Sequence, residues 1–127
     1  MLQPLIHYFL HFVAIALIAG LVDRKNWKRS YLILLATMLV DLDHLFATPI
    51  FDPDRCGIGY HPLHSEMAII IYFFGSILVK HQVFRLIFIG LLFHMLTDFI
   101  DCLWSFSKCS ECYYSSEIYK LKEFWFN

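Results

Sequence analysis

The sequence lacks an excess of charge of either sign, and this absence removes one large class of functions. Its 127 residues carry 10 basic and 11 acidic side chains, which gives a formal net charge of -1. Proteins that bind nucleic acids generally present clustered lysine and arginine to the phosphates. Because no such basic excess is available, we expect no nucleic-acid partner.

The amino terminus also lacks the features of a cleavable signal peptide. No lysine or arginine precedes the first apolar run, which begins after Pro4, and no site with small residues suited to cleavage precedes the next run. We therefore expect the first helix to stay in the mature protein.

In place of charge, the chain has long apolar runs. Hydrophobic residues make up 59% of the sequence, and they gather in four runs, at residues 5–22, 31–47, 61–79 and 83–104. A helix needs about 20 apolar residues to cross about 30 Å of hydrocarbon. The pattern predicts an all-α fold, an integral-membrane four-helix bundle over residues 1–104 with an outer-side loop. Residues 105–127 are expected to form a Cys-containing tail with a short C-terminal interfacial helix.

Basic residues between the runs predict the orientation of this bundle. Residues 23–30 contain two arginines and two lysines, and Lys80 and Arg85 lie at the turn between the third and fourth runs. Lysine and arginine are enriched in cytoplasmic loops. We therefore expect a bacterial inner (cytoplasmic) membrane protein whose N- and C-termini lie outside.

Six of the seven histidines, with several aspartates, would lie at the outer end of this bundle. Ionisable groups at membrane depth are costly and usually mark function. Imidazoles mixed with carboxylates are common ligands of Zn²⁺, Fe²⁺ and Mn²⁺. The predicted metal ligands are His7, His11, Asp41, Asp43, His44, His61, His64, His94 and Asp98.

The spacing of these residues places pairs of them on common helix faces. Residues three or four positions apart are neighbours on a helix, and four pairs fit this rule: His7 with His11, Asp41 with His44, His61 with His64, and His94 with Asp98. Asp43 lies off the face of Asp41 unless the helix loosens before Pro49. Asp101 extends the last face by one turn, and we assign it a catalytic, proton-handling or ligand-supporting role.

The number of candidate ligands exceeds what one tetrahedral ion requires. The set would suit two ions, or one ion with a rich shell of supporting hydrogen bonds. Zn²⁺ is the first choice of cofactor, with Fe²⁺ or Mn²⁺ as alternatives.

Three segments of the chain resemble a known family. Asp41-Leu42-Asp43-His44, a histidine pair followed by Ser65, and His94-Met95-Leu96-Thr97-Asp98 are similar to motifs of the YdjM-like predicted membrane-bound metal-dependent hydrolases. The first 104 or so residues look more closely like a small uncharacterised bacterial family of four-helix membrane proteins. The resemblance implies metal ligation by Asp41, Asp43, His44, His64, His94 and Asp98. The wider family tends to place more residues between the two histidines of the middle motif than this chain does.

The leading functional hypothesis is a membrane-embedded metal-dependent hydrolase that acts on a lipid ester or phosphodiester near the outer leaflet. His94 would lie about 10–15 Å below the outer surface, a depth that a lipid headgroup reaches more readily than a water-soluble substrate. The expected partners are therefore the lipid bilayer and a lipid substrate. A bundle rich in phenylalanine could also bury one face against a second copy, as a homo-oligomer.

Two alternatives involve no catalysis. One is a metal-binding or metal-permeating protein, and the other is a structural or partner-binding protein stabilised by an ion. Permeation is disfavoured because the inner half of the bundle contains almost no polar residue that could relay an ion.

The four cysteines all fall on the expected outer side of the bundle. An even number of cysteines in an oxidising compartment is compatible with two disulfides. Cys56 could pair with any of the other three, which are Cys102, Cys109 and Cys112.

Overall fold

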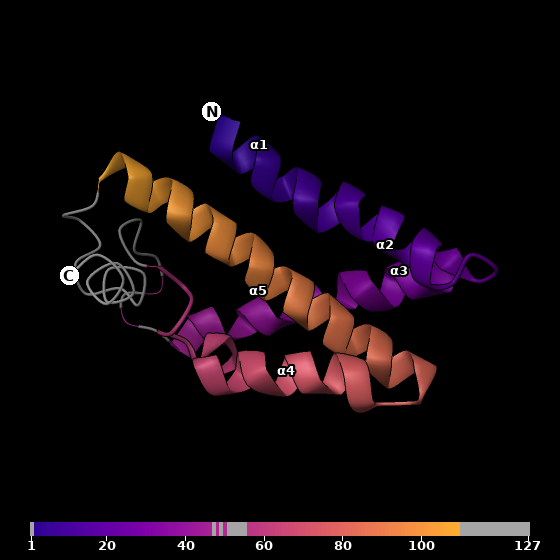
Figure 1. Ribbon diagram of the computed structural model, residues 1–127. Coiled ribbons are helices and arrows are strands. Elements are labelled where there is room, and N and C mark those ends of the chain that lie inside the picture. Colours follow the sequence, from indigo (N-terminus) through magenta and orange to yellow (C-terminus); the bar gives the residue numbers. More distant parts are fainter. Residues whose placement is uncertain (1, 47, 49, 51–55, 110–127) are drawn as a thin grey trace.

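The computed structural model describes residues 2–46, 48, 50 and 56–109, and every regular element within them is helical. The helices form four rods, and successive rods run in opposite directions (Figure 1). The first rod consists of α1 (Leu2–Phe9), the π-helix η1 (Leu10–Ala14) and α2 (Ile15–Val22). The others are α3 (Trp27–Ala36) with the 3₁₀-helix η2 (Thr37–Phe46), η3 (Pro62–His64) with α4 (Glu66–Leu78), and α5 (Gln82–Lys108). The predicted all-helical fold is confirmed for the described residues.

The rods differ in length. Those formed by Leu2–Val22 and Gln82–Lys108 are long and apolar enough to cross a membrane. The third predicted run is interrupted, because Ser65 is extended and its hydroxyl caps α4 by accepting the Ala68 N–H at 3.3 Å. As a result α4 has 13 residues, which span only about 20 Å.

Helix α5 is the central element, and it packs against α1, α3, η2 and α4. At Gly90 it approaches the second rod closely. A Cβ atom added there would lie 2.7 Å from Thr37 Oγ1 and 3.1 Å from Leu34 Cδ2. The two rods therefore meet at this distance only because residue 90 has no side chain.

The exterior of the molecule is rich in large apolar side chains. They are exposed on every rod, for example Leu21 at 86%, Phe46 at 85%, Leu78 at 68% and Phe84 at 57%. The buried residues, in contrast, include several histidines and an aspartate. Extended exposed apolar surfaces mark sites that contact membranes or other proteins.

Asp23 joins the two helix connections at the end of the molecule opposite the histidines. Its carboxylate accepts hydrogen bonds from the Asn26 backbone N–H at 3.0 Å and from the Gln82 side-chain amide at 2.7 Å. The backbone hydrogen bond from Asn26, supported by the side-chain bonds, lowers the pKa of Asp23 below its usual value of 3.8. The residue therefore links the start of α3 to the start of α5.

A disulfide closes the other end of the molecule. Cys56 pairs with Cys102, with their Cα atoms 5.5 Å apart, which selects one of the three pairings that the sequence left open. Cys109 is also in a disulfide.

Helix α5 continues to Lys108, beyond the expected boundary at residue 104. The predicted interfacial helix falls in residues 110–127, outside the described part of the chain.

Candidate metal centre

The backbone of the second rod changes from α-helix to 3₁₀-helix where its aspartates lie. Ten residues, Thr37–Phe46, adopt this tighter winding, although 3₁₀ runs longer than about four residues are uncommon. In a 3₁₀-helix residues three apart are eclipsed, so Asp41 shares a face with His44 and Asp43 shares one with Val40. Asp43 is consequently turned inward and is only 4% exposed. The helix therefore tightens at Asp43, where the prediction from the sequence required it to loosen, and this tighter winding turns Asp43 toward the site.

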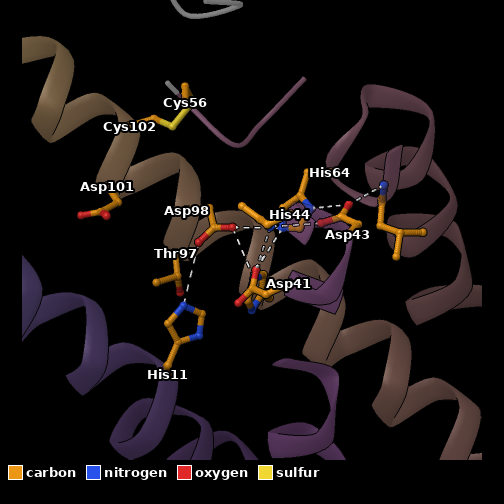
Figure 2. Close-up of polar contacts among 12 residues, drawn as sticks. His11, Asp41, Asp43, His44, Cys56, His64, Thr97, Asp98, Asp101 and Cys102 are labelled. Atoms are coloured by element: carbon orange, nitrogen blue, oxygen red, sulfur yellow. Dashed lines mark hydrogen bonds and ion pairs between the residues drawn. A yellow bond between two sulfur atoms is a disulfide. The ribbon is translucent and has the colours of Figure 1, made fainter. Parts of the chain in front are cut away.

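Four side chains from three elements, η2, η3 and α5, converge on one point. Asp41 Oδ1 lies 3.0 Å from His94 Nε2 and 3.5 Å from His64 Nε2. Asp98 Oδ2 lies 3.3 Å from each of these two nitrogens. Figure 2 shows the carboxylates of Asp41 and Asp98 directed toward this point from different elements.

The four nitrogen-to-oxygen separations are of the size found around one metal ion, and all four ligand atoms lie within 4.8 Å of one another. An ion with bonds of about 2.0–2.1 Å holds its ligand atoms about 3.3–3.4 Å apart, and the four separations lie between 3.0 and 3.5 Å. Among the described residues, His64 Nε2 has no hydrogen-bond partner although its side chain is fully buried. Two imidazoles and two carboxylates form a donor set suited to Zn²⁺, Fe²⁺ or Mn²⁺. The residues therefore fit the predicted cofactor.

Asp43 and Tyr72 fix the position of His64. One oxygen of Asp43 lies 3.1 Å from His64 Nδ1 and accepts the Leu63 backbone N–H at 2.9 Å. The Tyr72 hydroxyl donates to the Leu63 carbonyl at 3.1 Å. Carboxylates in this position orient metal-binding histidines and raise their basicity. Asp43 thus lies behind the imidazole ring, whose other nitrogen faces the cluster.

His44 and His61 form the outer rim of the site. His44 Nδ1 lies 3.1 Å from Asp43 Oδ1, so the Asp43 carboxylate faces two imidazoles. The His61 ring stacks on His44 with centroids 3.9 Å apart. His61 is buried, and among the described groups of three or more metal-compatible side chains it belongs to none. Its predicted role as a direct ligand has no support from this arrangement.

A second group of side chains lies on the other side of Asp98. His7, His11 and Asp98 each offer a ligand atom within 4.8 Å of the other two. His11 Nε2 lies 3.9 Å from Asp98 Oδ1, as the dashed line in Figure 2 marks. Asp101 faces His7, with Oδ2 3.4 Å from Nδ1, and not the four-atom cluster.

The four side chains of the cluster differ in exposure. Those of His64, His94 and Asp98 are 0%, 2% and 15% exposed, whereas that of Asp41 is 45% exposed. Asp41 is therefore the member of the cluster nearest to the surface.

The structure brings together eight of the nine predicted ligands, all except His61, in three overlapping groups. Two supporting residues are absent from the sequence-based prediction. Gln3, whose side-chain amide donates a hydrogen bond to Asp101 Oδ1 at 3.0 Å, lies one helical turn before His7. This spacing could have indicated that Gln3 belongs to the site. Tyr72 carried no signal, because an apolar stretch containing one tyrosine is an ordinary helix sequence.

The fold and the site together define an all-helical protein with a buried cluster of histidines and aspartates suited to a metal ion. The family model described as "Family of unknown function (DUF6122)" matches residues 1–105, and the chain belongs to this family. Neither the curated proteins nor the solved structures that were searched contain a match.

Proposed function

We propose that the protein is a membrane-embedded metal-dependent hydrolase that cleaves a lipid ester or phosphodiester near the outer leaflet. The observation that carries the proposal is the convergence of Asp41 Oδ1, His64 Nε2, His94 Nε2 and Asp98 Oδ2, all within 4.8 Å of one another. The kinship with the YdjM-like hydrolases indicated by the sequence motifs is part of this proposal.

Two features support insertion in a membrane. Long apolar helices form the first and fourth rods, and large apolar side chains are exposed on all four. The disulfide between Cys56 and Cys102 supports the orientation, because disulfides persist in oxidising compartments and this one lies at the histidine end. The basic residues 23–30 lie at the other end, which the orientation assigns to the cytoplasm.

The ligand residues also suit hydrolysis. A divalent ion held by them would polarise a carbonyl or phosphoryl oxygen and lower the pKa of a nearby water. Asp43 keeps His64 in the tautomer whose Nε2 faces the cluster. The partly exposed side chain of Asp41 marks the side from which a scissile bond would approach. Because four protein ligands would fill a tetrahedral ion, hydrolysis would need a fifth coordination position for the water.

An apolar cavity supports a lipid as the substrate. It has a volume of about 560 Å³ and is lined by residues of α2, α4 and α5, among them Ile18, Ile69, Phe93, Met95 and Phe99. Phe93 and Met95 flank His94 in the sequence, so the cavity lies beside the metal-binding segment of α5. A hydrocarbon chain is the ligand that such a lining accommodates.

Metal analysis tests the site. The full chain, purified in detergent without chelators, is expected to contain about one or two transition-metal ions. In His94→Ala and Asp98→Ala the cluster should lose its ion, whereas in His81→Ala it should keep it, because His81 is exposed and precedes the first residue of α5, at the other end of that helix from the cluster. A folded wild-type protein without metal would refute the site.

Activity is tested separately, with the metal-loaded protein in vesicles of phosphatidylglycerol and phosphatidylethanolamine. Release of a headgroup or fatty acid, lost in Asp98→Ala and retained in His81→Ala, would support the hydrolase. Full metal occupancy without turnover of any ester or phosphodiester lipid would instead indicate a non-enzymatic metal-binding protein.

A further inference from the structure

We propose that His7, His11 and Asp98 bind a second divalent ion, and that the carboxylate of Asp98 bridges it to the first. The proposal rests on the proposed function, because the first ion occupies the cluster described above. It assigns the first rod a direct part in a two-metal centre.

The two oxygens of Asp98 face different groups. Oδ2 lies 3.3 Å from both His64 Nε2 and His94 Nε2, whereas Oδ1 lies 3.9 Å from His11 Nε2. One carboxylate thus presents one oxygen to each group of imidazoles. Bridging two ions about 3.5–4 Å apart is a common role of such a carboxylate in two-metal hydrolases.

The imidazoles on the second side each have a buried nitrogen without a hydrogen-bond partner among the described residues. His11 is 2% exposed, and within the described part of the chain its Nε2 has no hydrogen-bond partner. The same holds for His7 Nδ1. Leaving a buried polar group unsatisfied costs about 1–3 kcal/mol, and a metal ion would remove this cost at both rings.

Asp101 completes this side. Gln3 donates to Asp101 Oδ1 at 3.0 Å and to the Ser105 hydroxyl at 2.8 Å, and Lys108 donates to the Gln3 side-chain oxygen at 2.7 Å. This chain of hydrogen bonds leaves Asp101 Oδ2 facing His7, 3.4 Å from Nδ1. Asp101 therefore acts as a positioning residue that orients His7.

The backbone of the first rod is irregular at the same place. The π-helix η1 covers Leu10–Ala14 and contains His11. Short π-helical segments within α-helices are rare and occur frequently at functional sites. The wider turn changes the direction of the His11 side chain from the one that a regular α-helix would give it, and in this position the ring faces Asp98.

A second ion narrows the substrate class of the proposed hydrolase. Two adjacent ions stabilise both the attacking and the leaving oxygen of an in-line displacement at phosphorus, as in phosphatases and nucleases. The two-metal centre therefore favours a lipid phosphodiester over a carboxylic ester.

The test is a metal titration of the detergent-purified full chain with Mn²⁺. Wild type and His81→Ala are expected to bind about two ions, and His11→Ala about one. In electron paramagnetic resonance, wild type should show an exchange-coupled Mn²⁺ pair and His11→Ala an isolated ion. If His11→Ala fails to fold, His7→Gln and Asp101→Asn take its place, with weaker binding of the second ion only.

The outcomes separate this proposal from the previous one. Wild type that binds one ion, with the same content in His11→Ala and loss in His94→Ala, would refute the second site and leave the first intact. Wild type that binds no ion would refute both. Loss of both ions in a folded His11→Ala would show that the two groups form a single site.

Discussion

Asp43 and His64 are joined by a contact of 3.1 Å between a carboxylate oxygen and Nδ1, and the same oxygen accepts the backbone N–H of Leu63 at 2.9 Å. The pair couples the 3₁₀-helix η2 to η3, the short helix before α4. It thereby fixes both the ring orientation of His64 and the path of its backbone.

Asp43→Asn should weaken metal binding about 10–100-fold, because carboxylates that orient metal-binding histidines typically contribute this much. The number of ions at saturation should not change, unlike in Asp98→Ala. Competition with a fluorescent chelator measures the affinity. Asp23→Asn, the same substitution at the opposite end of the molecule, is the control, and equal affinities for the two variants would contradict the assigned role of Asp43.

Tyr72→Phe should lower the free energy of unfolding by about 1 kcal/mol, because the Leu63 carbonyl loses its hydrogen bond from the hydroxyl. Thermal unfolding of the chelated protein in detergent measures this loss without a contribution from metal. Tyr8→Phe is the control, since Tyr8 is 58% exposed. If both variants unfold at the wild-type temperature, the hydroxyl does not hold the loop.

Gly90→Ala should destabilise the protein by about 1–3 kcal/mol, because the added methyl group would overlap Thr37. Gly20→Ala provides a comparison within another helix, where a Cβ meets no atom within 4 Å. There the change should be neutral or stabilising by up to about 1 kcal/mol. Chemical denaturation of the two variants measures the difference, and a reversed order would show that α3 and α5 do not pack closely at Gly90.

Replacing Cys56 and Cys102 together by serine should lower the free energy of unfolding by about 2–4 kcal/mol, because the bond closes a loop with a sequence separation of 46 residues. Denaturation of the oxidised wild type and the double variant measures the loss. Mass spectrometry of peptides from the non-reduced protein checks the pairing independently. A peptide that links Cys56 to any other cysteine would contradict it.

Asp23 should contribute stability above pH 4 that is lost in acid. Its pKa in the folded protein lies below the usual 3.8, so the folded state favours the carboxylate and binds fewer protons than the unfolded chain. The contribution is therefore fully present above that value and disappears as the pH falls through the lower pKa of the folded state. The melting temperature of wild type should exceed that of Asp23→Asn at neutral pH, and the gap should close as the pH falls below 3.8 and through the lower pKa of the folded state. A difference in melting temperature that does not change with pH would show that it does not depend on ionisation of the Asp23 carboxyl group.

The sequence predicted the helical runs and the convergence of the histidines because both depend on simple patterns. Apolar run length predicts helices, and alternating direction brings residues such as His11 and Asp98 to one end. The start of α4 at Glu66 could also be predicted, because a serine before an apolar run is a helix-capping signal. The predicted third run instead begins at His61. The shorter helix follows from this cap.

The sequence contained no signal for the backbone of the site. Neither the π-helix around His11 nor the 3₁₀-helix around Asp43 has a characteristic composition, because tertiary packing and buried hydrogen bonds select these windings. The 3₁₀ winding gives Asp43 and Asp41 their separate positions, Asp43 behind the His64 ring and Asp41 in the four-residue cluster. The pairing of Cys56 with Cys102 likewise depends on where a loop lies, which spacing does not encode.

The short length of α4, the main helix of the third rod, affects how a bilayer would accommodate the molecule. The 13 residues of α4 cover about 20 Å, whereas the hydrocarbon layer is about 30 Å thick. Lipids beside such a short segment respond to the hydrophobic mismatch by thinning, at a modest cost for each ångström. Thinning at the His64 end would lower the neighbouring headgroups toward the cluster, so that deformation of the bilayer itself would bring phosphates within reach of a buried site.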